Sequence, residues 1–256
     1  MKPFITLLLL FALATSCQAE LRILGEESPP GEYLDENGNP AGVTIDLVND
    51  LLSRLDLTAS IEILPWKRAY HMGLNGPEIA LMETTRTEKR ENLFKWVGPI
   101  LVVNRIIYAR ADFPDNVNRL ADLQQDWTIC VLRASSNESH LQSLGIRQIY
   151  PVTKPSQCVA MLLADRVRLF YSSEIGMAGL LAEKKLAPAA FKDVLTLQKE
   201  YLYLAFSLDV SDDRIGRWQA SLEAAKKDGT VAAIYKDAYP DAMIKEVCLP
   251  GDPLTK

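Results

Sequence analysis

Cysteine and histidine are scarce in this chain of 256 residues, which contains four cysteines and two histidines. Beyond the N-terminus, Cys130, Cys158 and Cys248 stand apart from one another, unlike the closely spaced cysteines of zinc sites. His71 and His140 are far from them in sequence, and we expect both to be structural residues. The sequence therefore predicts no metal site.

The chain also lacks the motifs of common catalytic and nucleotide-binding sites. It has no phosphate-binding P-loop, no GxSxG nucleophile elbow and no HExxH zinc motif. Internal repeats and low-complexity tracts are absent from the sequence too. We therefore expect neither an enzyme nor a cofactor.

An excess of positive charge is also missing. The chain holds 28 Lys and Arg against 33 Asp and Glu, and loss of an N-terminal leader whose only charge is Lys2 would leave 27 − 33 = −6. Such a balance disfavours the phosphates of nucleic acids and anionic membrane surfaces as partners. We expect no nucleic-acid partner.

Long apolar runs are missing after the N-terminus. Residues 1–19 combine Lys2, an apolar run at 4–14 and small residues ending at Ala19, which predicts a signal peptide that is cleaved after Ala19. The apolar run is shorter than the roughly 18 residues of a membrane span. In an alternative interpretation, the residues up to Cys17 form a lipoprotein signal and Cys17 is lipidated.

Export would place the remaining cysteines in an oxidising compartment, where disulfides form. Cys130, Cys158 and Cys248 allow three single pairings with one thiol left over, and the sequence does not choose among them.

Apolar patterning predicts strands and helices that alternate along the chain. Strands are expected at 21–25, 61–64, 101–108, 127–132, 147–150, 167–171 and 201–207. Helices are expected at 43–55, after Pro65, and at 135–144, 155–163, 175–183, 212–226 and 231–239. Strands alternating with helices indicate mainly parallel sheets covered on both faces. The strand at 101–108 is apolar except for Asn104 and Arg105.

The most informative segment is 84–100. Thr87 is expected to cap a short helix that starts at Glu88 and holds Arg90 in its first turn. Because a guanidinium group beside hydroxyls can bind a carboxylate through two parallel hydrogen bonds, Arg90 with Thr85 forms a candidate anion site. The alternative is a surface helix whose cations face water.

An aromatic strand is expected to follow this helix and to stop at Gly98 and Pro99.

The order of motifs resembles that of the bacterial family 3 extracellular solute-binding proteins, over nearly all of the chain beyond the leader. The residues behind this resemblance are Glu27-Ser28-Pro29-Pro30, Tyr33-Leu34-Asp35-Glu36-Asn37-Gly38, Gly42-Val43-Thr44-Ile45-Asp46-Leu47, Pro65-Trp66-Lys67-Arg68-Ala69, Thr85-x-Thr87-x-x-Arg90, Trp96-Val97-Gly98-Pro99 and Lys227-Asp228-Gly229-Thr230.

The resemblance implies an α/β fold of the two-lobed type II periplasmic-binding-protein class, with a ligand enclosed between the lobes. Lobe 1 would comprise residues 20–108 and 203–256, and lobe 2 residues 109–202. Each lobe would be a mainly parallel sheet flanked by helices, and two hinge strands would join them. A hinge of this kind lets ligand contacts on both sides stabilise a closed form.

The resemblance and the positions of loops at strand ends together yield the candidate ligand-binding residues. Arg90 matches the family position that holds a ligand carboxylate, and Thr85 matches a neighbour that assists it. The full set is Arg90, Thr85, Tyr33, Glu27, Trp66, Arg68, Ser135, Ser136, Ser173 and Glu174. Simpler roles compete for several of them: core packing for Trp66 and Tyr33, a solvated loop for Glu27, and an ordinary helix cap for Ser135 and Ser136.

Two departures from the family pattern concern the other end of the ligand. Many amino-acid receptors place an aspartate for the ligand ammonium where this chain has Ser173, with Glu174 one residue later. Gly31 stands where relatives often have an aromatic residue. A carboxylate-bearing solute is therefore a broader and safer expectation than an α-amino acid.

The resemblance favours a monomeric periplasmic binding protein that delivers a small polar solute to an ABC permease. A sensor that reports ligand occupancy to a membrane signalling protein is an alternative. A third class is a periplasmic cyclohexadienyl dehydratase, for which Glu27 or Glu174 would be the acid, although neither lies in a recognisable catalytic pattern.

Overall fold

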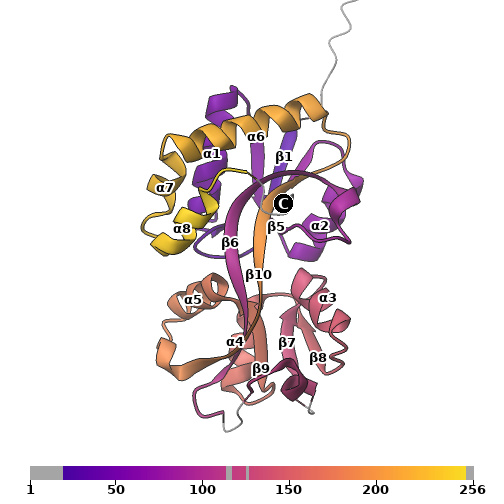
Figure 1. Ribbon diagram of the computed structural model, residues 1–256, viewed down its shortest axis with the longest axis vertical. Coiled ribbons are helices and arrows are strands. Elements are labelled where there is room, and N and C mark those ends of the chain that lie inside the picture. Colours follow the sequence, from indigo (N-terminus) through magenta and orange to yellow (C-terminus); the bar gives the residue numbers. More distant parts are fainter. Residues whose placement is uncertain (1–19, 114–116, 125–126, 252–256) are drawn as a thin grey trace, which may run out of the picture.

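The computed structural model describes residues 20–113, 117–124 and 127–251, so the predicted signal peptide and Cys17 lie outside the described residues. The chain forms two α/β lobes that are joined by two long strands, β6 (Lys95–Arg110) and β10 (Phe191–Phe206) (Figure 1). Both strands belong to one sheet with the order β4-β1-β5-β10-β6-β9-β7-β8. The predicted two-lobed fold class is confirmed.

Lobe 1 contains the β4-β1-β5 side of this sheet. Its strands are β1 (Leu21–Gly25), β4 (Ala59–Ile63) and β5 (Ile79–Thr85), with a separate hairpin of β2 (Tyr33–Leu34) and β3 (Pro40–Ala41). Its helices are α1 (Val43–Leu55), α2 (Trp66–Asn75), α6 (Asp212–Lys227), α7 (Thr230–Tyr235) and α8 (Asp241–Val247). Strand β1 pairs in parallel with both β4 and β5.

The side chains of β1 alternate between two apolar clusters, as the period of two in a strand requires. Leu21 and Ile23 pack in the cluster formed with α1 and α6 to α8, whereas Leu24 packs with Trp66 and Ala69 of α2. Helices therefore cover both faces of the lobe 1 sheet, and the polar ends of its strands are left to form a site.

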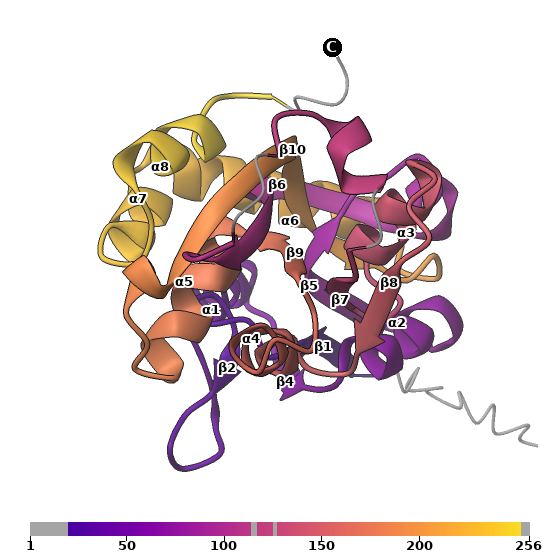
Figure 2. The same cartoon turned by 90° about the horizontal axis from the view of Figure 1, so that it is seen from below.

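Lobe 2 is built in the same way around β7 (Ile129–Leu132), β8 (Ile149–Val152) and β9 (Leu169–Ser173), which pair in parallel. Its helices are α3 (Ser136–Ser143), α4 (Pro155–Leu163) and α5 (Glu174–Glu183), with short 3-10 turns η2 (Leu120–Gln124) and η3 (Pro188–Ala190). Helices α3 and α5 lie on opposite sides of β7 and β9 (Figure 2).

Strands β6 and β10 are antiparallel partners over nearly their whole length, and each contributes to both lobes. Val97 and the residues from Ile100 to Val103 join the lobe 1 core, whereas Ile106 and Ile107 join the two clusters of lobe 2. The predicted lobe boundaries at 108/109 and 202/203 fall within these strands. They stay predictions, because each crossing strand is shared by the two lobes.

Two local predictions around Arg90 are wrong. The helix expected from Glu88 is a turn followed by a 3-10 helix, η1 (Glu91–Leu93), for which Arg90 is the residue before the first turn. The strand expected to stop at Gly98 and Pro99 runs through them as β6.

Strand β6 can continue through Gly98 and Pro99 because a side chain outside the sheet binds the backbone of Gly98. The Gln219 side chain accepts a hydrogen bond from the Gly98 N–H at 2.8 Å and donates one to the Gly98 carbonyl at 3.0 Å. The pairing register with β10 also shifts between Leu202 and Leu204, next to the proline that cannot donate. A tertiary contact thus overrides the usual strand-breaking effect of this dipeptide.

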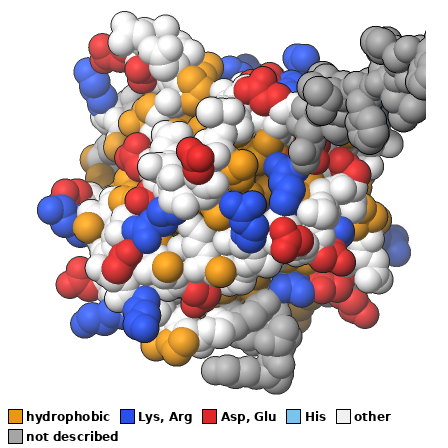
Figure 3. Space-filling model, turned by 90° about the horizontal axis from the view of Figure 1, so that it is seen from above, with side chains coloured by type: hydrophobic (Ala, Val, Ile, Leu, Met, Phe, Trp, Pro, Cys, Tyr) orange, Lys and Arg blue, Asp and Glu red, His pale blue; other side chains and the backbone are white. Residues whose placement is uncertain are grey.

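The part of the chain that the structure describes contains neither a candidate membrane-spanning helix nor a candidate metal cluster. No helix within it is long and apolar enough to cross a membrane. Within the same ranges, no group of three or more His, Cys, Asp or Glu side chains could hold a metal ion. On the face seen from above, acidic and basic side chains are interspersed and form no large patch of one charge (Figure 3).

A disulfide links Cys130 on β7 to Cys158 on α4, and Cys248 is a free thiol. The pairing that the sequence left open is therefore decided by packing. Cys130 points to the α4 face of the lobe 2 sheet, within the cluster that also holds Val159 and Leu162. The bond closes a loop with a sequence separation of 28 residues.

We expect reduction of this disulfide to lower the free energy of unfolding by about 3–4 kcal/mol, the loop-entropy value for a closed loop of this length. Urea unfolding of the chain from residue 20, with and without dithiothreitol, measures the difference. A Cys130→Ala/Cys158→Ala variant is the control and should not respond to dithiothreitol. An unchanged midpoint for fully reduced wild-type protein would contradict the prediction.

Candidate functional site

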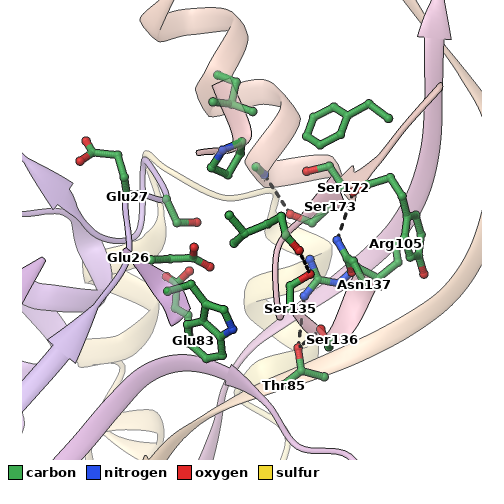
Figure 4. Close-up of a pocket in the computed structure, with 18 of the residues that line it drawn as sticks. Glu26, Glu27, Glu83, Thr85, Arg105, Ser135, Ser136, Asn137, Ser172 and Ser173 are labelled. Carbon is green, nitrogen blue, oxygen red and sulfur yellow. Dashed lines mark hydrogen bonds between the residues drawn. The ribbon is translucent and has the colours of Figure 1, made fainter. Parts of the chain in front are cut away.

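A cavity lies between the two lobes, where the carboxyl ends of β1, β5, β7 and β9 meet the N-terminal ends of α2, α3 and α5 (Figure 4). Ligands bind at such strand ends in open α/β sheets. The lining residues are Glu26, Glu27, Ser28, Pro29, Trp66, Glu83, Thr85 and Arg90 from lobe 1, Arg105 from the crossing strand β6, and Leu132, Ser135, Ser136, Asn137, Pro155, Phe170, Tyr171, Ser172, Ser173, Gly176 and Leu180 from lobe 2.

The two lobes touch beside this cavity, so the structure is a closed form. The indole Nε1 of Trp66 donates a hydrogen bond to the carbonyl oxygen of Ala134 in lobe 2 at 3.0 Å. The hydroxyl oxygens of Ser136 and Thr85 are 3.2 Å apart across the same boundary. Leu132 of lobe 2 packs in the apolar cluster that contains Trp66.

A second contact between the lobes depends on a glycine. Gly179 of α5 lies against the loop after β1, where an added Cβ atom would be 2.1 Å from the carbonyl oxygen of Pro29. Because that oxygen is backbone, it cannot move aside as a flexible side chain would. The closed form therefore requires a residue without a side chain at this position.

Arg90 is buried beside the cavity, with 7% of its surface exposed. Its guanidinium carbon lies 4.9 Å from the ring centre of Tyr70 and 5.4 Å from that of Trp66, distances typical of cation–π contacts. It donates a hydrogen bond to the Thr85 carbonyl at 3.2 Å and forms no ion pair within the described residues. Burial lowers the pKa of Arg90, so the protein itself stabilises this charge incompletely.

A second arginine lies where the strands cross between the lobes, and it is paired. The Nε of Arg105 on β6 donates to a carboxylate oxygen of Glu200 on β10 at 2.5 Å. The same oxygen accepts a hydrogen bond from the Thr85 hydroxyl at 3.0 Å. Burial alone would raise the pKa of Glu200, but attraction to Arg105 and its hydrogen bond outweigh burial and lower that pKa. Arg105 and Glu200 therefore form an ion pair in which each charge already has a partner within the protein.

Two carboxyl groups of lobe 1, Glu26 and Glu83, face the cavity without such a partner. Burial, followed by repulsion from Glu83, raises the pKa of Glu26 to about 8. Burial raises the pKa of Glu83 to about 7, against the opposing hydrogen bond from the Thr44 hydroxyl and the charge of Arg105.

Lobe 2 lines the cavity with neutral polar groups. The Ser135 hydroxyl accepts from the N–H of Glu138 and donates to the Leu132 carbonyl, so Ser135 is also the N-cap of α3. Ser173 is the N-cap of α5 through the N–H of Gly176. Ser135 and Ser173 are therefore both helix caps and part of the cavity wall.

The structure brings most of the candidate residues together around the cavity. Those that line it are Arg90, Thr85, Glu27, Trp66, Ser135, Ser136 and Ser173. Tyr33 lies in the β2–β3 hairpin and Arg68 is exposed on α2, and neither lines the cavity. The Glu174 carboxylate accepts hydrogen bonds from the backbone N–H and the side-chain amide of Asn104, so it faces β6 and not the cavity.

Sequence reasoning missed several cavity residues, chiefly Glu26, Glu83, Arg105 and Asn137. Arg105 did leave a signal, because it interrupts an otherwise apolar strand, where an arginine needs a reason to be buried. Glu26 was hidden by its neighbour Glu27, since nothing local indicates which of two consecutive acids turns inward. Glu83 lies at the end of β5, a strand that the apolar pattern did not reveal.

Comparison with solved structures shows the same fold in several proteins of low sequence identity. A histidine kinase sensor domain with similarity to periplasmic binding proteins has a TM-score of 0.79 at 19% identity, covering 86% of this chain and 95% of the other. The substrate-binding protein of an amino acid ABC transporter has a TM-score of 0.74 at 15% identity, covering 86% and 99%.

An ancestral amino acid-binding protein, a precursor of cyclohexadienyl dehydratase, also shares the fold. Its TM-score is 0.74 at 18% identity, covering 86% of this chain and 95% of the other. No curated protein sequence matches this chain significantly.

The sequence itself is more specific than these likenesses of fold. The family model of the bacterial extracellular solute-binding proteins, family 3, matches residues 21–240, which include lobe 2, lobe 1 without α8, and all the residues that line the cavity. The chain therefore belongs to the bacterial extracellular solute-binding proteins, family 3.

Proposed function

We propose that this protein is a periplasmic, monomeric receptor that encloses a small carboxylate-bearing solute between its lobes and delivers it to an ABC permease. An extracellular solute-binding family implies a place outside the cytoplasm and a small-molecule ligand. Three further statements are part of the proposal: the solute carries a carboxylate, the protein is in the periplasm, and it delivers the solute to a permease.

The observation behind the carboxylate is the state of Arg90. This guanidinium group is almost fully buried at the wall of a closed cavity, and no acidic side chain pairs with it in the described part of the chain. An unpaired buried charge is costly unless a ligand compensates it. A carboxylate can accept two parallel hydrogen bonds from the planar guanidinium group and supply the missing charge.

A sensor that signals to a membrane protein is the second candidate. The likeness to a histidine kinase sensor domain supports it, and the likeness to an ABC transporter component supports the first candidate equally. Ligand capture is common to both. Solute uptake by cells that lack the protein separates them, since a transport receptor is required for uptake at low solute concentration and a sensor is not.

We propose binding without chemical turnover. The two acids weighed for dehydratase chemistry are poorly suited to it, because Glu27 is exposed and Glu174 is engaged by Asn104. Release of phenylpyruvate from prephenate, or of phenylalanine from arogenate, by the purified protein would overturn this part of the proposal.

We expect Arg90→Ala to weaken binding of a carboxylate ligand by about 3 kcal/mol, roughly a hundredfold, because two charge-assisted hydrogen bonds are lost. The ligand would come from a thermal-shift screen of amino acids, polyamines, dicarboxylates and small peptides. At 100 times its dissociation constant, a ligand stabilises the protein by about 2.7 kcal/mol. Lys89→Ala, an exposed neighbour, is the control. If the Arg90→Ala variant binds the ligand with unchanged affinity, Arg90 does not bind the ligand carboxylate.

We expect Gly179→Ala to weaken ligand binding although Gly179 is a helix residue that alanine would normally stabilise. The added methyl group would meet the Pro29 carbonyl and obstruct closure, at a cost of about 1–3 kcal/mol, or roughly five- to hundredfold in affinity. Calorimetric titration measures the effect.

Gly216→Ala on α6 is the matched control, because an added Cβ there has no neighbour within 4 Å. If Gly179→Ala binds the ligand as tightly as the wild type does, ligand capture does not involve the closed form described here.

A further inference from the structure

Glu26 and Glu83 project from neighbouring strands of lobe 1 into the cavity that also holds Arg90. We propose that these two carboxyl groups bind a protonated amine or guanidinium group of the solute, so that the ligand is a zwitterion held at both charged ends by lobe 1. This proposal rests on the proposed function and adds the chemical class of the ligand.

The pairing of the strands brings the two acids together. In the parallel pair β1 and β5, Leu24 is the partner of Leu81. Glu26, directly after β1, and Glu83 each lie two residues further along, so the register places them at the same level. Glu83 has a φ of 42°, next to a shift in the pairing of β5 with β10, so its side chain departs from the regular alternation of the strand. In Figure 4 the Glu26 carboxyl group points into the cavity near that of Glu83, whereas the Glu27 carboxyl group points away.

Some of the acceptor atoms that line the cavity have no donor among the described residues. The Glu26 carboxyl group has no hydrogen bond or ion pair with any described residue, and one oxygen of Glu83 accepts from Thr44. From the opposite wall, Asn137 lines the same cavity with 7% of its surface exposed. Its Oδ1 atom is buried and has no partner in the described ranges, although its amide nitrogen donates to the Tyr171 carbonyl.

Asn137 is independent of the acids, because it belongs to lobe 2 and is neutral. Carboxylate oxygens are acceptors, so a group that satisfies Glu26 and Glu83 must carry several donors, and the amide oxygen of Asn137 offers a further acceptor from the opposite wall. A positive charge is required as well, since two carboxylates at close range repel each other in a site with little water. An ammonium or guanidinium group meets both conditions, and a hydroxyl or second carboxylate does not.

The surrounding charges do not already satisfy this need. Arg90 and Arg105 lower the pKa of Glu26, but burial and Glu83 outweigh them. Arg105 is committed to Glu200. Behind the site, fully buried Glu32 accepts a hydrogen bond from the Glu26 N–H at 2.9 Å, and burial raises its pKa well above the ordinary value.

Among the described residues of lobe 2 that line the cavity, none is an acid that could bind the cation instead. Ser173 stands where an acid is common in related receptors, and its hydroxyl caps α5. The neighbouring acid Glu174 faces Asn104. The charged ends of the ligand would therefore meet lobe 1, and the neutral groups of lobe 2 would complete the contacts on closure.

Matched pairs of compounds test the proposal on the chain from residue 20. Each L-amino acid, including lysine and arginine, is compared with its 2-hydroxy acid, which keeps the carboxylate and replaces the ammonium group by a hydroxyl. The ω-amino acid 5-aminopentanoate is compared with pentanoate in the same way. We expect at least one amine to raise Tm and bind at least a hundredfold more tightly than its uncharged partner.

Variants then identify the residues responsible. Glu26→Gln and Glu83→Gln should each reduce the preference for the amine over its partner at least tenfold, whereas the exposed control Glu36→Gln should keep it. Circular dichroism and Tm of the free variants show whether they fold. Equal binding of an amine and its partner, or an unchanged preference in both variants, overturns the cation site and leaves the carboxylate receptor standing. If no carboxylate binds at all, the proposed function fails as well.

The proposal also predicts a pH dependence with a definite sign. Because the free site holds protons near neutral pH and a cation binds the ionised carboxylates, binding releases protons. Affinity for the amine should rise with pH between 6.0 and 8.5, by up to about tenfold per pH unit for each proton released. Titration calorimetry in phosphate and Tris buffers counts these protons, and Glu26→Gln should release fewer.

The free protein provides a check that needs no ligand. A carboxyl group whose pKa is higher in the folded than in the unfolded state destabilises the fold when it ionises, so wild-type stability should fall as pH rises from 6 to 9. Over the same pH range the Glu26→Gln variant should lose less stability than the wild type does. The Glu36→Gln control should lose as much as the wild type. A wild type and a Glu26→Gln variant with the same slope would contradict the proposal.

Discussion

The pairing of β6 with β10 is the constraint on which the rest of the structure depends. These two strands run through both lobes, so their residues between the lobes must pair with each other and also border the cavity. At the crossing, the apolar pattern gives way to the ion pair of Arg105 with Glu200, and Thr85 hydrogen-bonds both partners. A buried pair of this kind contributes more to defining one geometry than to stability.

The charged side chains at the cavity are distributed unequally between the two lobes. Lobe 1 places Arg90, Glu26 and Glu83 at the cavity, while lobe 2 contributes serines and Asn137. Burial raises the pKa of Glu26 and of Glu83 and lowers the pKa of Arg90, so in each case it favours the uncharged form. Such shifts are expected of buried groups that lack a partner of opposite charge. A solute with complementary charges would supply the partners that these groups lack in the protein. The narrow contact of Gly179 with Pro29 shows how close the lobes must come before this can happen.

Much of the architecture could be predicted because it depends on local patterns. The helix expected at 43–55 is α1, with the bounds that its apolar face indicated, and the helix expected at 155–163 is α4. Predictions failed where a distant contact decided the outcome. Gln219 satisfies the backbone at Gly98 and lets β6 continue, and β10 begins ten residues earlier than expected because its polar first half pairs with β6. A place in the cavity wall could be predicted where a motif was present, as at Thr85 and Arg90, and not where one of two adjacent acids turns inward, as at Glu26 and Glu27.

The sequence by itself determined most of the alternation of strands and helices and the family, and it made Arg90 a candidate anion site, because these follow from periodicity and motif order. Only the tertiary structure decided which cysteines pair, which of two adjacent glutamates enters the cavity, and that Glu174 turns to Asn104. Those outcomes depend on strand register and on contacts between residues far apart in the chain. A side chain's direction, and with it its charge state, is set by neighbours that the local sequence does not contain.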